Sequence, residues 1–191
     1  ALAGNGEVRT VTDIFFHPGD PGFGYDFALY KLDSPFTSLL PAELYLGNIE
    51  VGMDSDLVGY GVLRNLGESV GVYTGDKLAG NNVIFETGFY GDFVTTSLAH
   101  PVFDAAIFRE LGMAGTPGDS GGGLFIDGRL AGIMSFSSTV LGLNQYGART
   151  GYSQLDRSWM YSTMSSVPEP SSIILLGMAS VFCLKRARRK T

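Results

Sequence analysis

The sequence predicts a single all-β domain of the barrel or sandwich type, followed by a distinct C-terminal tail. Two observations carry this prediction. The chain of 191 residues is rich in glycine and aromatic residues, with 27 Gly, 13 Phe and 9 Tyr, and only 17% of its residues are charged. Its apolar stretches are short and are separated by Gly, Asn, Asp and Ser, which is typical of strands joined by turns.

The expected elements follow from the apolar stretches in chain order. A strand-like run begins at Asp26 and ends at Leu32. Further candidate strands are 51–61, 70–74, 83–89, 93–98, 123–126 and 130–136, and a helical pattern covers 154–164. The sequence has no internal repeat and no cluster of metal-ligand residues, and its glycine-rich loops lack the Lys-Ser/Thr of a phosphate-binding loop. We therefore expect no cofactor.

The most informative motif is the hexapeptide 118–123, Gly-Asp-Ser-Gly-Gly-Gly, which leads into the apolar residues 124–126. It places Ser120 in a turn whose glycines can adopt positive φ and let the backbone approach a ligand. A serine hydroxyl becomes a useful nucleophile only beside a base, an orienting carboxylate and an oxyanion site. The alternative for this motif alone is an ordinary hairpin loop.

A candidate carboxylate is Asp26, which lies 94 residues before Ser120 at the head of its strand-like run. In the serine-protease template the aspartate precedes the serine by about 93 residues, so the spacing fits. The alternative is that Asp26 only caps a strand after the Pro/Gly-rich loop 18–24.

In these features the sequence resembles the chymotrypsin-like (S1) serine proteases. The segment 25–32 is similar to their aspartate strand, and 58–61, Val-Gly-Tyr-Gly, is similar to the start of their second barrel. Residues 130–136 resemble the strand after the nucleophile, and 151–164 the closing strand and terminal helix. The resemblance implies a double six-stranded β-barrel over 1–164, with an incomplete first barrel and a short C-terminal helix.

The resemblance also implies the roles of individual residues. Ser120 attacks the substrate, Asp26 orients a histidine, and the amides of Gly118 and Ser120 hold the oxyanion. In this family, the acid before the serine, here Asp119, pairs with a freed N-terminal amine.

By the same resemblance, the substrate pocket comprises Ala114 at its floor and Ser135, Phe136 and Ser137 along the strand that pairs with bound peptide. Thr150 and Gly151 are expected to line the opposite wall. Because Ala114 is not an acid, a bound Lys or Arg side chain would lack a counter-charge. The resemblance therefore favours a neutral side chain of small or medium size, and a protein or peptide substrate.

The chain offers only two histidines, His17 and His100. The family places its histidine about 45 residues before the aspartate, whereas only 25 residues precede Asp26. His17 resembles the surface segment before the aspartate, and His100 follows it. We therefore expect an N-terminally truncated, nearly inactive serine endopeptidase. The alternative function is a non-catalytic, protease-like surface module that binds peptide or polysaccharide.

The C-terminal residues 165–191 form the second predicted region. Pro168, Glu169 and Pro170 precede an apolar segment within 171–184, and a basic end covers 185–190. This layout resembles the PEP-CTERM sorting tail of Gram-negative bacteria. It implies processing by an exosortase, a transmembrane-like helix over 171–184, and membrane association through 171–190. The protein would then be exported and reach the cell surface or the medium.

Charge separates the two regions. Residues 1–167 contain 8 basic and 18 acidic residues, a net charge of −10, whereas the tail carries +4. The strongly negative net charge of residues 1–167 argues against nucleic acid as a partner. The one cysteine, Cys183, belongs to the tail, so the folded domain has no disulfide.

Overall fold

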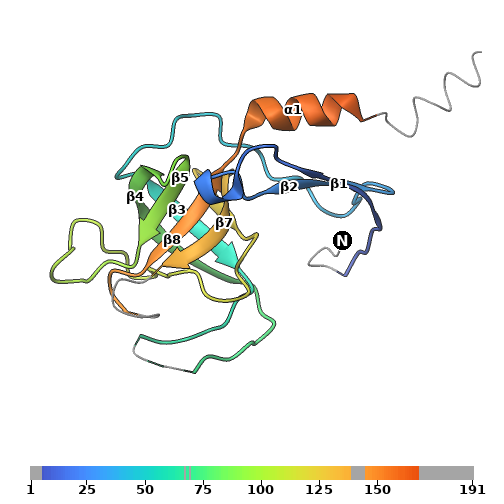
Figure 1. Ribbon diagram of the computed structural model, residues 1–191. Coiled ribbons are helices and arrows are strands. Elements are labelled where there is room, and N and C mark those ends of the chain that lie inside the picture. Colours follow the sequence, from blue (N-terminus) through green and yellow to red (C-terminus); the bar gives the residue numbers. More distant parts are fainter. Residues whose placement is uncertain (1–5, 67, 69, 139–144, 168–191) are drawn as a thin grey trace, which may run out of the picture. The chain divides into compact units, whose positions relative to one another are not determined.

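The structure, a computed structural model, describes residues 6–66, 68, 70–138 and 145–167. It divides into two compact units, Ala1–Leu155 and Asp156–Thr191. Figure 1 shows the first unit as a barrel with an additional pair of strands, β1 and β2. The expectation of an all-β fold with a barrel and a short C-terminal helix is confirmed for the described residues.

Six antiparallel strands close the barrel in the order β3-β4-β5-β8-β7-β6. Their bounds are Asp54–Gly59 (β3), Leu78–Phe89 (β4), Phe93–Ser97 (β5), Gly123–Ile126 (β6), Arg129–Ser138 (β7) and Arg149–Gln154 (β8). Because β3 also pairs with β6, this sheet has no free edge strand.

Alternating burial along the strands creates the barrel core. In β3, Ser55, Leu57 and Gly59 are buried, whereas Asp54 and Asp56 are exposed, which is the two-residue period of a strand with one buried face. The core cluster consists of Leu57, Ile84, Val94, Leu124, Ile126, Ala131, Met134 and Tyr152. Burial raises the pKa of the Tyr152 phenol, so this side chain stays neutral within the core.

The pair β1 (Val11–Phe16) and β2 (Ala28–Leu32) forms a separate antiparallel sheet. The loop between these strands, which includes the 3-10 helix η1 (Pro21–Phe23), is attached to the barrel at Asp92. The Asp92 amide donates to the Phe23 carbonyl at 3.0 Å, and the Tyr25 hydroxyl donates to the Asp92 carboxylate at 2.5 Å. These bonds fix the loop that carries Asp26 against the barrel.

Several sequence-based elements or boundaries were wrong. The strand predicted over 51–61 is only Asp54–Gly59, and residues 70–74 contain only an isolated bridge from Val72 to Leu63. Strand β4 begins at Leu78 instead of 83, because residues 80–82, Gly-Asn-Asn, continue its pairing with β3. The helix α1 runs from Arg157 to Ser166 instead of 154–164, because the Asp156 side chain accepts a hydrogen bond from the Trp159 amide and caps its N-terminus.

The predicted tail helix over 171–184 and the basic end 185–190 lie outside the described residues. None of the helices in the described ranges has the length and apolarity needed to cross a membrane. The division predicted after residue 164 falls inside α1.

Leu124→Ala is expected to lower the free energy of unfolding by about 2–5 kcal/mol, because Leu124 is fully buried in the barrel and its truncation leaves a cavity. Urea titration followed by tyrosine fluorescence measures this loss. Leu40→Ala is the matched control, since Leu40 is 96% exposed and should change stability little. Equal losses in the two variants would contradict the described core.

Candidate active site

Ser120 follows a tight turn that precedes β6. The Asp119 amide donates to the Thr116 carbonyl at 3.0 Å, and Gly118 has φ +98°. With Pro117 at the second position and a positive φ at the third, this is a type II turn, for which glycine is strongly favoured. The turn leaves Ser120 exposed.

The residues after Ser120 join this loop to β7. The Gly121 amide donates to the Met134 carbonyl at 2.9 Å, and the Met134 amide donates to the Gly122 carbonyl at 2.8 Å. Two backbone hydrogen bonds thus hold the loop on a strand of the closed barrel, so the position of Ser120 depends on regular sheet structure.

Two backbone amides beside the serine hydroxyl are available to a ligand. Within the described ranges, neither the Gly118 N–H nor the Ser120 N–H donates to a protein acceptor. Tyr73 covers the turn: its hydroxyl donates to the Pro117 carbonyl at 3.1 Å, and its ring would lie 3.0 Å from a Cβ at position 118. Such unbonded amides can stabilise negative charge that develops on a carbonyl oxygen.

The carboxylate of Asp119 points away from solvent and is 7% exposed. It accepts hydrogen bonds from the Gly61 amide at 2.7 Å, the Thr116 amide at 2.9 Å and the Thr116 hydroxyl at 3.0 Å. Charge-assisted bonds of this kind compensate for the desolvation of a buried carboxylate. The contacts lock residues 116–119 into one arrangement.

The position of the Asp119 carboxylate explains why residues 59 and 61 of the Val-Gly-Tyr-Gly motif are glycines. A Cβ at Gly59 would lie 1.9 Å from the Asp119 carboxylate oxygen, and one at Gly61 would lie 2.4 Å from its carboxylate carbon. Both distances are far below van der Waals contact, so the acid can enter the barrel only past two residues without side chains.

Asp26 reaches the barrel from the loop before β2. Its carboxylate accepts a hydrogen bond from the Ser135 hydroxyl at 2.6 Å, and its amide donates to the Ser153 hydroxyl at 3.1 Å. Ser135 lies on β7 and Ser153 on β8, so two neighbouring strands position this exposed acid. The sequence analysis assigned Ser135 to the substrate pocket and did not predict its hydrogen bond to Asp26, because no spacing in the sequence indicates such a contact.

Neither histidine has its Nδ1 directed to Asp26. His17 Nδ1 accepts from the Gly19 amide at 3.0 Å, and the ring stacks on Tyr25 with centroids 4.5 Å apart. His100 Nδ1 accepts from the Val102 amide at 3.1 Å. The His17 imidazole is thus held within the connection between β1 and β2, whereas the His100 ring also packs against Tyr146, with ring centroids 4.5 Å apart.

Of the residues predicted to line the substrate pocket, Ser137 on β7 and Thr150 on β8 form hydrogen bonds with Gly115, the residue after Ala114. Ala114 is partly buried, and the Ser137 hydroxyl donates to the Gly115 carbonyl at 2.6 Å. The Phe136 ring packs edge-on against Phe93, with centroids 5.0 Å apart. A Cβ on Gly151 would lie 2.2 Å from this ring, so Phe136 covers the Gly151 backbone.

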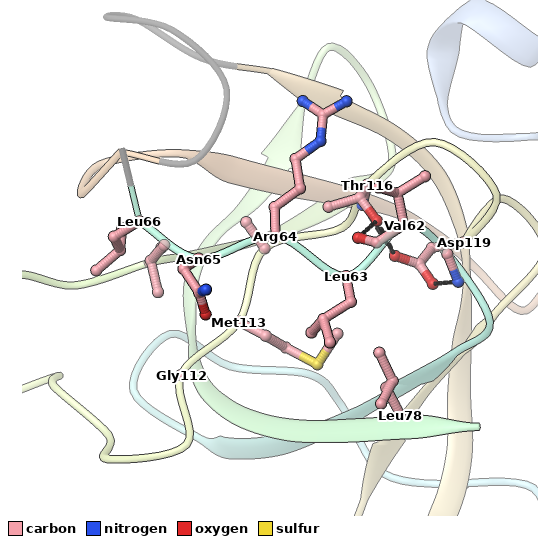
Figure 2. Close-up of a pocket in the computed structure, with 13 residues that line it drawn as sticks. Val62, Leu63, Arg64, Asn65, Leu66, Leu78, Gly112, Met113, Thr116 and Asp119 are labelled. Atoms are coloured by element: carbon pink, nitrogen blue, oxygen red, sulfur yellow. Dashed lines mark hydrogen bonds between the residues drawn. The ribbon is translucent and has the colours of Figure 1, made fainter. Parts of the chain in front are cut away.

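A pocket lies beside Asp119 (Figure 2), and Ala114, the predicted floor of the substrate pocket, is among the residues that line it. Its volume is about 250 Å³. The labelled residues in Figure 2 that line it are Val62, Leu63, Arg64, Asn65, Leu66, Leu78, Gly112, Met113, Thr116 and Asp119.

In the described ranges, no group of three or more His, Cys, Asp or Glu side chains could hold a metal ion.

A closed six-stranded barrel with an exposed serine in a glycine-rich turn defines the class of trypsin-like serine protease folds. The family model described as trypsin matches residues 2–158, and the chain belongs to this family. A second model, the PEP-CTERM protein-sorting motif, matches residues 166–190.

Among solved structures, the chain is similar to neuropsin, a serine protease expressed in the limbic system of mouse brain. The two share 20% sequence identity at a TM-score of 0.59, over 82% of this chain and 71% of that one. This likeness supports the fold. A comparison with curated proteins finds no match.

Gly61→Ala is expected to displace the Asp119 carboxylate, because the added methyl group would overlap it, and to cost about 1–3 kcal/mol of stability. Chemical denaturation measures the cost, and hydrogen exchange at Thr116 and Ser120 reports on the turn. Gly22→Ala is the control, since its Cβ would lie no closer than 3.3 Å to its nearest neighbour, a side-chain oxygen of Asp20. Unchanged exchange in Gly61→Ala would contradict the role given to Asp119.

Proposed function

We propose that this chain carries the nucleophile of a serine endopeptidase that hydrolyses peptide bonds through an acyl-enzyme. The observation that carries the proposal is the exposed Ser120 beside the unbonded amides of Gly118 and Ser120. Ser120 Oγ would form a bond to the scissile carbonyl carbon while these amides hold the resulting oxyanion. Membership of the trypsin family supports this reaction class.

Asp26 is proposed as the carboxylate that orients the catalytic base. That base, a histidine, would take the proton of Ser120 and give it to the leaving amine as the C–N bond breaks. Water then attacks the acyl-enzyme and releases the acid product. Because Nδ1 of His17 and Nδ1 of His100 each accept a hydrogen bond from a backbone amide two residues further on, the proposal assigns the base to neither.

The sorting motif supports a proposal for the route of the protein. We propose that the enzyme is exported and cut by an exosortase near Pro168, Glu169 and Pro170, after transient membrane association through 171–190. The basic end 185–190 suits the cytoplasmic face of the membrane. The proposed partners are therefore a protein or peptide substrate and the processing enzyme, at the cell surface.

A fluorophosphonate probe, applied to the protein isolated from its natural host, should form a covalent adduct on Ser120, because only an activated serine reacts. Peptide mass spectrometry locates the adduct. Ser120→Ala should abolish labelling, and Asp26→Asn should slow it by up to about 10⁴-fold, the loss seen in the serine-protease template.

The second candidate function is a peptide-binding module without catalysis. It is favoured by the partners of these side chains: the Asp26 carboxylate accepts a hydrogen bond from the Ser135 hydroxyl, and Nδ1 of each histidine accepts one from a backbone amide. A folded host protein that binds peptides but takes no label at Ser120 would establish this function and overturn the enzyme proposal.

A further inference from the structure

The orientation of a single peptide group determines where the Gly118 N–H points. This N–H and the Pro117 carbonyl belong to the same peptide, which is planar and trans, so the two groups point in opposite directions. A contact that holds the carbonyl on one side therefore directs the N–H to the other side. There, no protein acceptor within the described ranges receives it.

The local sequence leaves this orientation open. The turn over 116–119 is closed by the Asp119 amide, which donates to the Thr116 carbonyl. Proline at the second position suits both type I and type II turns, and glycine at the third permits either sign of φ. The two forms differ by a rotation of the Pro117–Gly118 peptide of roughly 150–170°, and both keep the closing hydrogen bond. A contact from outside the turn must therefore select the observed form.

Two donors from one other segment hold the Pro117 carbonyl. The Val62 amide donates to this oxygen at 3.1 Å, and the Tyr73 hydroxyl donates to it at 3.1 Å. A carbonyl oxygen has two lone pairs, so both acceptor positions are used. In the rotated form the Val62 N–H would lose its acceptor, which is costly because Val62 is only 7% exposed.

The segment that supplies these donors is itself fixed by backbone pairing. Leu63 and Val72 exchange hydrogen bonds at 2.9 Å and 3.0 Å, so Val62 and Tyr73 form the adjacent pair of the same antiparallel bridge. The Thr116 hydroxyl lies 2.8 Å from the Val62 carbonyl oxygen (Figure 2). The Tyr73 hydroxyl is thus placed at the turn by the backbone on which it stands, although the side chain is 63% exposed.

On the basis of the proposed function, we propose that Tyr73 is a positioning residue of the oxyanion site, which acts through the Pro117–Gly118 peptide. The contacts form a chain from the Tyr73 O–H to the Pro117 carbonyl and from the Gly118 N–H to the oxyanion. Negative charge on the oxyanion polarises the peptide and makes its carbonyl a better acceptor. The Tyr73 hydrogen bond is then stronger in the transition state than in the ground state, which is the condition for accelerating the reaction.

The first test measures the peptide orientation without catalysis. Tyr73→Phe removes the hydroxyl and keeps the exposed ring. Amide hydrogen exchange of the full chain, followed by NMR, should become about 2- to 10-fold faster at Val62, the equivalent of one lost hydrogen bond. The Asp119 amide should exchange at its wild-type rate, because its bond is present in both turn forms. The buried Ile84 amide, which donates to the Met53 carbonyl, reports on the barrel and should also remain unchanged.

The second test measures the catalytic consequence. Tyr73→Phe protein from the natural host should react with the fluorophosphonate at a maximal rate about 2- to 10-fold below wild type, with unchanged reversible affinity for the probe. The split between rate and affinity follows because Tyr73 touches the peptide and the substrate does not depend on it for binding. Tyr161→Phe is the matched control, since Tyr161 is an exposed residue of α1 and should alter neither exchange nor labelling.

The outcomes separate this inference from the proposed function. An unchanged Val62 exchange rate or an unchanged labelling rate in Tyr73→Phe would overturn the inference and leave the enzyme proposal standing. Equally faster exchange at Val62, Asp119 and Ile84 would overturn it too, because the hydroxyl would then have only a general structural role. Absence of labelling in the folded wild-type protein would overturn the proposed function, and with it the catalytic role of Tyr73, whereas Val62 exchange would still decide whether Tyr73 holds the peptide.

Discussion

The buried carboxylate of Asp119 determines how the rest of the candidate site is arranged. It lies inside the domain with donors from two separate segments, one at Gly61 and one at Thr116. Because an unpaired buried charge costs several kcal/mol, the segments that supply these donors must stay in place. The neighbouring Ser120 is then necessarily directed outward, so the exposure of the nucleophile is a consequence of burying the acid before it.

Hydrogen bonds likewise attach Asp26 to the same barrel. Its contacts are two serine hydroxyls on β7 and β8, and β7 also holds the nucleophile loop through the backbone of Met134. One strand therefore connects the acid from the N-terminal sheet with the serine that lies 94 residues later. The geometry between them depends on the register of β7, which the closed barrel fixes on both sides.

The sequence predicted the features that depend on local pattern. The glycine-rich serine turn, the acid at the head of β2 and the strands β5, β6 and β7 could be located because apolar alternation and turn residues are adjacent in the chain. The sequence-based predictions were wrong or incomplete where a feature depends on a contact with a distant segment of the chain. Residues 80–82, Gly-Asn-Asn, belong to β4 because they pair with β3. The hydroxyl of Ser135 donates to Asp26, and the side chain of Met134 packs against Gly115 of another segment.

The sequence has no cysteine before residue 183, so hydrogen bonds and packing hold these segments together. The Thr116 hydroxyl lies within hydrogen-bond distance of both the Asp119 carboxylate and the Val62 carbonyl. Such bonds contribute about 1 kcal/mol each, less than a typical disulfide. These segments therefore gain their rigidity from several weak bonds together with tight packing at Gly59, Gly61 and Gly115.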